Sequence, residues 1–243
     1  MQRNYLSGQQ IIGITGGIGS GKSRVASFLS EEYNLPLINL DQVCRDLLQP
    51  RKAGWQALRH LLPDQYFKEN GEVDRPYFRR QLFADTSLRE QVDAALHPLA
   101  RQEMEQRIRD VTGNIVPIAQ DAVGANPCVR PGIQDTDRPG RHRGLPLRNE
   151  FPVLVEIPLL FEAGWQDDVD VILVVYAEED VRMQRVMERD QVTAEQARQV
   201  IAAQQCLREK AASADYVIDN SGSWEYTCSQ IQQIETKASA LLR

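Results

Sequence analysis

The stretch from Ile11 to Ser23, IIGITGGIGSGKS, decides the fold. Its opening residues, Ile11–Thr15, are apolar and mostly β-branched, which is typical of a parallel strand buried on both faces. A glycine-rich turn comes next, and beyond it Val25, Phe28 and Leu29 recur at helical spacing. The stretch therefore predicts a strand, a tight turn and a helix in direct succession.

The turn itself, Gly16–Ser23, matches the phosphate-binding pattern G-x-x-x-x-G-K-[ST] in its required context. Glycines let backbone N–H groups converge on phosphate oxygens, and the following helix adds its positive N-terminal end. In such loops the lysine, here Lys22, reaches the β- and γ-phosphates, and the final hydroxyl, here Ser23, binds Mg²⁺. The nucleotide-binding residues are thus predicted to be Gly17, Ile18, Gly19, Ser20, Gly21, Lys22 and Ser23. A glycine-rich turn that binds nothing is the alternative, and the flanking strand and helix argue against it.

Four more apolar runs extend the pattern of strands separated by helices. They are Leu35–Leu40, Pro152–Ile157, Asp170–Tyr176 and Tyr216–Ile218. Together with the first run they predict an α/β fold, a parallel five-stranded sheet flanked by helices.

Two segments between the second and third apolar runs do not follow the pattern of strands separated by helices. Residues 53–110 are mostly helical by pattern, with a turn at Asn70-Gly71 and a helix break at His97-Pro98. We interpret them as a helical insert carried by the sheet. Residues 113–149 are rich in Pro, Gly, Asn and Arg without any period, which predicts a long loop or a disordered excursion. The expected organisation is one domain over 11–243, with its core in 11–50 and 151–243.

Composition excludes several classes of protein. A net charge of −6 argues against a surface built for nucleic acid or anionic membrane. The four cysteines, Cys44, Cys128, Cys206 and Cys228, form no CxxC pair, so neither a zinc site nor a disulfide framework is indicated. The first ten residues lack an apolar signal region, and no apolar run is long enough for a membrane span. We expect a soluble cytoplasmic protein, with a monomer favoured.

Asp41 follows directly after the second predicted strand. The carboxyl ends of parallel strands are where ligands of such folds bind, so a carboxylate there could orient or deprotonate an attacking hydroxyl. An Asp between a strand and a helix is equally often a helix N-cap. Spacing alone leaves the two interpretations balanced.

Several segments together resemble one family, the dephospho-CoA kinases. They are Gly16–Ser23, Asp41-x-x-x-Arg45, Asp74-Arg75, Phe83, His97-Pro98-Leu99, Pro158-Leu-Leu-Phe-Glu162, Ala202-Ala-Gln204 and Ala214-Asp-Tyr-Val-Ile-Asp-Asn220. They follow the family's order over nearly the whole chain, without the first ten residues and 113–149. The resemblance implies a P-loop kinase-like fold with a helical substrate-binding insert and a lid at about 178–205. It implies an ATP-dependent phosphotransferase with an alcohol group as acceptor, acting with Mg²⁺ on the ribose 3′-hydroxyl of dephospho-CoA in the last step of coenzyme A biosynthesis.

The resemblance also assigns residues to the acceptor. Asp41 becomes the catalytic carboxylate that faces the 3′-hydroxyl, and Arg45 helps to hold the acceptor. His97 is assigned to acceptor binding, with a helix kink before Pro98 or an ordinary hydrogen-bonding histidine as alternatives. The segment Glu156–Glu162 is placed at the end of the third predicted strand, lining the acceptor side, and Pro158, Leu159 and Leu160 are assigned to acceptor binding. A core role for the two leucines is favoured.

Arg182, Arg185 and Arg189 share one face of a predicted helix because they are spaced three and four apart. That face could simply be solvated, with Glu178, Glu179 and Glu188 as pairing partners. Alternatively, it could belong to a lid whose arginines stabilise charge on the triphosphate and exclude water. Arg189 matches the family's lid arginine best and is predicted to be catalytic, together with Asp41 and Lys22.

One departure from the family lies beside the predicted catalytic residue, where Asn39 replaces a common Asp. Three other functions each account for part of the sequence. A P-loop kinase of a nucleoside or nucleotide would lack the match around His97 and Pro158–Glu162. A non-enzymatic nucleotide switch that reads guanine would carry Asn-Lys-x-Asp, which is absent. An interaction protein would work through the arginines of 113–149.

Overall fold

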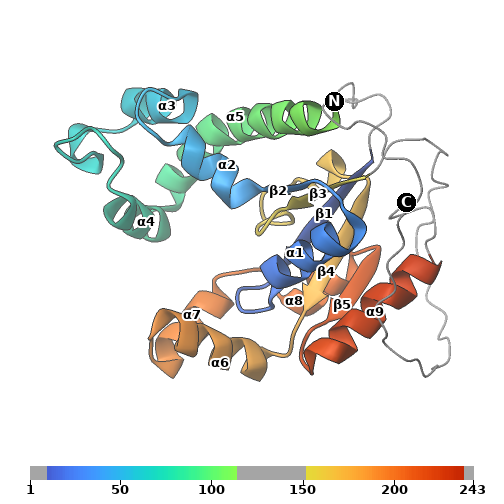
Figure 1. Cartoon of the computed structure of the whole chain (residues 1–243). Helices are drawn as coiled ribbons and strands as arrows, with labels where there is room; N and C mark the ends of the chain where they lie inside the picture. The colour runs from blue at the N-terminus through green and yellow to red at the C-terminus, as the bar shows by residue number, and fades with distance from the viewer. Residues whose placement is uncertain (1–9, 114–151, 238–243) are drawn as a thin grey trace. The chain divides into compact units, whose positions relative to one another are not determined.

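The computed structural model describes residues 10–113 and 152–237 (Figure 1). The described residues form two compact units, one of residues 10–37 and 152–237 and the other of Ile38–Gly113. The predicted lid belongs to the first unit and the predicted helical insert to the second. Residues 114–149 of the predicted loop lie outside the described residues.

The sheet has five strands in the order β2-β3-β1-β4-β5. Their bounds are β1 Ile11–Gly16, β2 Leu37–Asn39, β3 Val153–Glu156, β4 Val171–Tyr176 and β5 Tyr216–Asp219. The pairs β1–β3, β1–β4 and β4–β5 are parallel, so the predicted parallel five-stranded sheet is confirmed. The second strand is shorter than expected because Asn39 caps the next helix, which begins at Leu40.

β1 lies at the centre of the sheet and every one of its residues is buried. It pairs with β3 on one side, where Ile14 is level with Glu156, and with β4 on the other, where Ile14 is level with Leu173. This burial on both faces explains why the strand reads as a continuous apolar run rather than an alternating one. The carboxyl ends of β1 and β3 therefore reach the same edge of the sheet.

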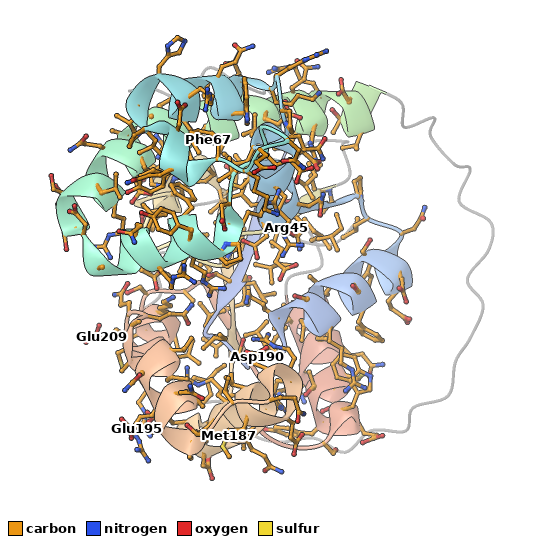
Figure 2. The ribbon with its side chains drawn as sticks, turned by 90° about the vertical axis from the view of Figure 1, so that its left-hand side faces the viewer. Arg45, Phe67, Met187, Asp190, Glu195 and Glu209 are labelled. Carbon is orange, nitrogen blue, oxygen red and sulfur yellow. The ribbon has the colours of Figure 1, made fainter. Side chains whose placement is uncertain are left out.

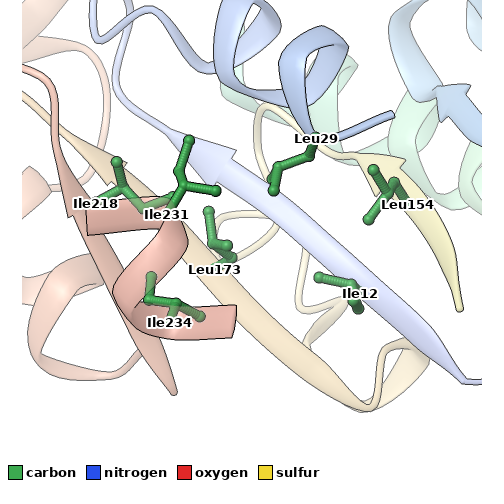
Figure 3. A pocket seen from close by; sticks show the side chains of 7 residues that line it. All are labelled: Ile12, Leu29, Leu154, Leu173, Ile218, Ile231 and Ile234. Atoms are coloured by element: carbon green, nitrogen blue, oxygen red, sulfur yellow. The ribbon is translucent and has the colours of Figure 1, made fainter. Parts of the chain in front are cut away.

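The helices of the first unit are α1 Lys22–Tyr33, α6 Glu179–Asp190, α7 Ala194–Ala202, α8 Leu207–Ala212 and α9 Trp224–Lys237, with a short 3₁₀ turn, η2, at Gln166–Asp168. The helices α1, α8 and α9 pack against strands of the sheet, whereas α6 and α7 pack against each other. Leu29 of α1 and Ile231 of α9 pack with Ile12, Leu173 and other strand residues in one core. This core contains a cavity of about 10 Å³. Figure 3 shows the aliphatic side chains that line it. Because no polar group lines it, we assign it to packing rather than to a ligand.

The second unit consists of four α-helices and a short 3₁₀ turn. They are α2 Leu40–Leu47, α3 Ala53–Leu61, η1 Asp64–Tyr66, α4 Arg75–Ala84 and α5 Thr86–Gly113. The helices α2, α3 and α4 all contact α5. The predicted turn at Asn70-Gly71 is confirmed, with Gly71 at a φ of 81°. Over the two described ranges, no helix combines the length and the apolarity needed to cross a bilayer.

The helix break predicted at His97-Pro98 is wrong, because α5 continues through it with Pro98 inside the helix. An internal proline removes one backbone hydrogen bond and costs about 3 kcal/mol. Helices in proteins gain most of their stability from packing of one face, and α5 buries Val92 before the proline and Met104 and Ile108 after it. The buried face on both sides of the proline thus outweighs the local preference.

Candidate active site

The phosphate-binding loop follows β1 and ends at α1, as the sequence predicts. Gly21 is the N-cap residue of α1 with a φ of 85°, and Gly19 has a φ of 76°. A Cβ on Gly19 would come within 2.7 Å of the Arg182 carbonyl oxygen, and a Cβ on Gly21 would collide with Nδ2 of Asn220. Both glycines are therefore required by backbone conformation and by close approach at once.

Two side chains from distant parts of the chain bind the carbonyl groups of this loop. Arg185 of α6 donates to the Gly19 carbonyl at 3.3 Å, and its other terminal nitrogen donates to the Asn220 carbonyl at 2.9 Å. Nδ2 of Asn220, after β5, donates to the Ser20 carbonyl at 2.7 Å, while its Oδ1 accepts from Thr227 at 3.0 Å. The two contacts with the loop both engage carbonyl oxygens, those of Gly19 and Ser20, so the loop shape suited to anion binding by N–H groups is stabilised from the carbonyl side.

Ser23 lies beside a buried carboxylate. Its hydroxyl donates a 2.6 Å hydrogen bond to Oε1 of Glu156, the last residue of β3, which is only 3% exposed. A hydroxyl oxygen and a carboxylate oxygen are ligands that Mg²⁺ prefers, and P-loop enzymes hold the metal with the loop Ser/Thr and an acidic residue of a neighbouring strand. In such a site the nucleotide phosphates supply the remaining metal ligands. The described residues include no cluster of three metal-ligating side chains, and a site of this kind does not require one.

Glu156 is a candidate metal-binding residue that the sequence pattern does not single out, because the sequence predicts it only as the first residue of the segment that lines the acceptor side. The signal was present, because Glu156 ends the apolar run of β3 just as the phosphate-binding loop follows the end of β1. What the sequence lacked was the strand order, which puts β3 next to β1.

The three arginines of α6 have three different environments. Arg182 is 7% exposed, and its terminal nitrogen lies 2.6 Å from where a Cβ on Gly17 would be. Arg185 binds the loop as described above. Arg189 is paired with Asp190 at 2.7 Å, with its side chain 60% exposed, and Figure 2 labels Asp190 at the end of α6. The solvated-face interpretation is therefore wrong for Arg182 and Arg185, and the catalytic role of Arg189 stays a prediction.

Asp41 and Arg45 belong to α2, in the second unit. The N-cap of α2 is Asn39, whose side chain accepts from the Gln42 amide at 3.0 Å. The capping interpretation of Asp41 is therefore wrong. Asn39, which replaces an Asp common in the family, caps α2 instead. Asp41 and Arg45 are both exposed and lie one helical turn apart on the same face of α2.

Of the remaining acceptor candidates, one differs in burial from what was expected. Leu160 is fully buried, as its core interpretation requires, but Leu159 is 47% exposed, so the core interpretation is wrong for Leu159. Pro158 precedes them, and its carbonyl accepts a 3.4 Å hydrogen bond from Thr15. His97 of α5 is half-buried, with Nε2 3.7 Å from Oδ1 of Asp93. The acceptor roles of these residues stay predictions.

A parallel five-stranded sheet with this loop after its first strand defines the class of the P-loop kinases. Structural comparison agrees: a Thermus thermophilus protein superposes with a TM-score of 0.68 at 26% identity, covering 95% of this chain and 98% of that one. The dephospho-CoA kinase of Campylobacter jejuni shares the fold, with a TM-score of 0.56 at 18% identity over 94% of this chain and 98% of that one.

The sequence comparisons identify the family. The family model described as Dephospho-CoA kinase matches residues 10–120 and 141–225. The chain is 34% identical to the dephospho-CoA kinase of Desulfotalea psychrophila over 90% of its own length and 93% of the relative's. It is 32% identical to that of Oceanobacillus iheyensis over 93% and 96%. The chain belongs to the dephospho-CoA kinase family, and it is a kinase that acts on a hydroxyl group.

Proposed function

We propose that the loop Gly16–Ser23 holds the triphosphate of ATP with Mg²⁺, and that the acceptor is the ribose 3′-hydroxyl of dephospho-CoA. The observation that carries the proposal is the 2.6 Å contact between Ser23 Oγ and Glu156 Oε1 at the end of this loop. Lys22 and the loop N–H groups bind the phosphates. Ser23 and Glu156 hold Mg²⁺, which when bound neutralises charge on the transferring phosphoryl group.

Asp41 accepts a hydrogen bond from the 3′-hydroxyl and orients its oxygen toward the γ-phosphorus of ATP. The bond between the γ-phosphorus and the oxygen that bridges it to the β-phosphate breaks as the new P–O bond forms. The hydroxyl proton passes to the exposed Asp41 carboxylate and from there to solvent, so the products are CoA, ADP and a proton. Arg45, His97, Pro158 and Leu159 are proposed to hold the acceptor, and Arg189 to stabilise charge on the triphosphate once its pair with Asp190 opens. Leu160 is fully buried and supports the acceptor segment from the core.

Coupled ADP release tests the proposal directly. The full chain is assayed with dephospho-CoA, adenosine, other nucleosides and shikimate at equal concentrations, with and without Mg²⁺. We expect turnover with dephospho-CoA only, and no turnover without Mg²⁺. Equal or faster turnover of another acceptor would overturn the acceptor assignment and favour the nucleoside-kinase alternative.

The residues for the acceptor are tested separately from those for ATP. Asp41→Asn keeps the size of the side chain and its exposure, so the fold should be unchanged while kcat drops by about 100-fold or more. Asp64→Asn, on the exposed η1 turn, is the matched control and should retain full activity. Equal kcat for the Asp41 variant and the wild type would remove Asp41 from the mechanism.

The setting of the reaction is also part of the proposal. The acidic net charge, the cysteines without metal-ligand spacing and the small-molecule substrates are consistent with a monomer that acts in the cytoplasm without nucleic-acid or membrane partners. Light scattering at assay concentration tests the monomer. A dimer whose activity depends on protein concentration would contradict it.

A further inference from the structure

The segment that follows α7 makes a direct contact with the phosphate-binding loop. Oε1 of Gln204 accepts a 2.8 Å hydrogen bond from the backbone N–H of Ile18. The two residues are 186 positions apart in the chain. Gln204, at the C-terminal end of the predicted lid, thus accepts a hydrogen bond from an amide of the phosphate-binding loop.

The next residue of this segment is anchored to the loop after β3. The Gln205 N–H donates to Oε1 of Glu162 at 3.2 Å, and the same oxygen accepts from Nζ of Lys210 at 2.6 Å. The Lys210 side chain is completely buried, while that of Glu162 is 24% exposed. A buried ammonium group needs a carboxylate partner, since removal of one member of such a pair leaves an uncompensated charge. The Glu162–Lys210 pair therefore fixes the backbone at Gln205.

A fixed backbone at Gln205 limits where the neighbouring side chain of Gln204 can reach. The amide that it binds belongs to the peptide between Gly17 and Ile18, inside the loop. The C=O of this peptide accepts a 3.2 Å hydrogen bond from the Ser20 N–H, and Gln204 holds its N–H. Glycine permits rotation of the peptide sterically, and rotation would turn both groups away from these partners. A loop that binds anions through N–H groups loses its geometry when one peptide turns over.

We propose that Gln204 is a positioning residue for ATP, which holds the Gly17–Ile18 peptide in the orientation that phosphate binding requires. The Glu162–Lys210 pair holds Gln204 in turn. The inference rests on the proposed binding of ATP to this loop, and it gives Glu162 a role on the nucleotide side rather than the acceptor side. It predicts that changes at these residues weaken ATP binding and leave the binding of dephospho-CoA intact.

Gln204→Met is the main test, because methionine has the length of glutamine but no amide oxygen. Binding of an unreactive ATP analogue with Mg²⁺ is measured by calorimetry, and KM for ATP, KM for dephospho-CoA and kcat by coupled ADP release. We expect the dissociation constant and KM for ATP to rise about tenfold, with KM for dephospho-CoA changed less than twofold. Gln233→Met, on an exposed position of α9, is the matched control and should behave as the wild type.

A purely structural role for Gln204 would lower the midpoint of thermal unfolding and leave KM for ATP unchanged. ATP binding within twofold of the wild type in Gln204→Met therefore overturns the proposal. If that variant fails to fold, Gln204→Asn, which keeps the amide but is one methylene shorter, is judged by the same criterion. If the wild type itself does not bind the analogue, it is the proposed function that fails.

The link to the buried pair is tested with Glu162→Gln and Lys210→Met together, because the first change alone would leave the lysine without a counter-ion. We expect this double variant to weaken ATP binding several-fold. Adding Gln204→Met to it should weaken binding less than twofold further, since the same contact is already lost. If the loss of ATP affinity in the triple variant equals the product of the losses in the double variant and in Gln204→Met, the pair and Gln204 act independently. That result would contradict the proposed link.

Discussion

Ser23 and Glu156 are 133 positions apart in the chain, yet their side-chain oxygens lie 2.6 Å from each other. The contact forms because β3 pairs with β1, and Glu156 is level with Ile14, two residues before the phosphate-binding loop begins. One oxygen comes from a hydroxyl and the other from a carboxylate that is almost fully buried. This pair leads directly to a test of the proposed metal site.

Glu156→Gln should reduce activity without disturbing the fold. The amide oxygen can still accept the hydrogen bond from Ser23, but the negative charge that would bind Mg²⁺ is lost. We expect kcat/KM to fall at least about 100-fold, equivalent to about 2.7 kcal/mol, and to recover partly at high Mg²⁺. The measurement is coupled ADP release over a Mg²⁺ titration, with Glu32→Gln on the exposed face of α1 as control. Activity within threefold of the wild type would rule out a metal role for Glu156.

Gly19→Ala and Gly71→Ala form a matched pair, since both glycines have a φ near 80° but only Gly19 is close to other backbone. No atom lies within 4 Å of a Cβ on Gly71, so its substitution should cost only the conformational penalty of about 1 to 2 kcal/mol. The Gly19 variant adds a collision with the Arg182 carbonyl, which cannot move aside as a side chain can. We expect it to lose ATP binding and considerably more stability, measured by calorimetry and urea unfolding. Equal effects at the two sites would contradict the prediction.

Asn220→Asp replaces the donor to the Ser20 carbonyl by an acceptor. Because Asn220 is only 5% exposed, the variant either buries a carboxylate against a carbonyl oxygen or must take up a proton. We expect a loss of about 3 kcal/mol in the free energy of unfolding at pH 7, together with weaker ATP binding. Asn70→Asp, in the exposed turn before Gly71, should change stability by less than about 0.5 kcal/mol. Urea unfolding of both variants is the measurement, and similar losses would count against the role of Asn220.

Arg189→Ala and Arg185→Ala should separate catalysis from loop support. The Arg189 pair with Asp190 is exposed and contributes little stability, so its variant should unfold like the wild type while kcat falls about 100-fold. Arg185 donates to two backbone carbonyls, so its variant should lose both stability and ATP affinity. Thermal unfolding and steady-state kinetics give the two quantities. An Arg189 variant with unchanged kcat would remove it from the catalytic residues.

Cys44 should be a slow nucleophile at neutral pH. Desolvation by the surrounding protein, followed by the Asp41 carboxylate, raises the pKa of its thiol to about 11, although the residue as a whole is exposed. Only the thiolate reacts, so alkylation should be slow at pH 8 and accelerate toward pH 11. Asp41→Asn removes the second cause and should lower the pKa, which speeds alkylation at pH 8.

Iodoacetamide labelling followed by mass spectrometry of the Cys44 peptide measures these rates across pH. Asp64→Asn is the control, because its carboxylate is not among the causes of the shift. Labelling of Cys44 at pH 8 as fast as that of a free thiol would show that its pKa is not raised.

Local patterns were sufficient for the framework of the molecule. The strand, loop and helix of Ile11–Tyr33 could be predicted because a strand buried on both faces reads as an apolar run and the loop needs its glycines in consecutive order. The other four strands followed from the same physics. The sequence was misleading where packing outweighs local preference, as in α5, which continues through Pro98, and at Leu159, which is exposed despite its apolar side chain.

The sequence by itself determined which residues could bind a phosphate, because that function resides in one contiguous turn between a strand and a helix. Only the tertiary structure decided which residues surround that turn: Glu156 from β3, Arg185 from α6, Gln204 after α7 and Asn220 after β5. Their proximity depends on the order of the strands, which no local pattern encodes. A parallel sheet brings the carboxyl ends of its strands to one edge, so residues that are remote in the chain meet at a single loop.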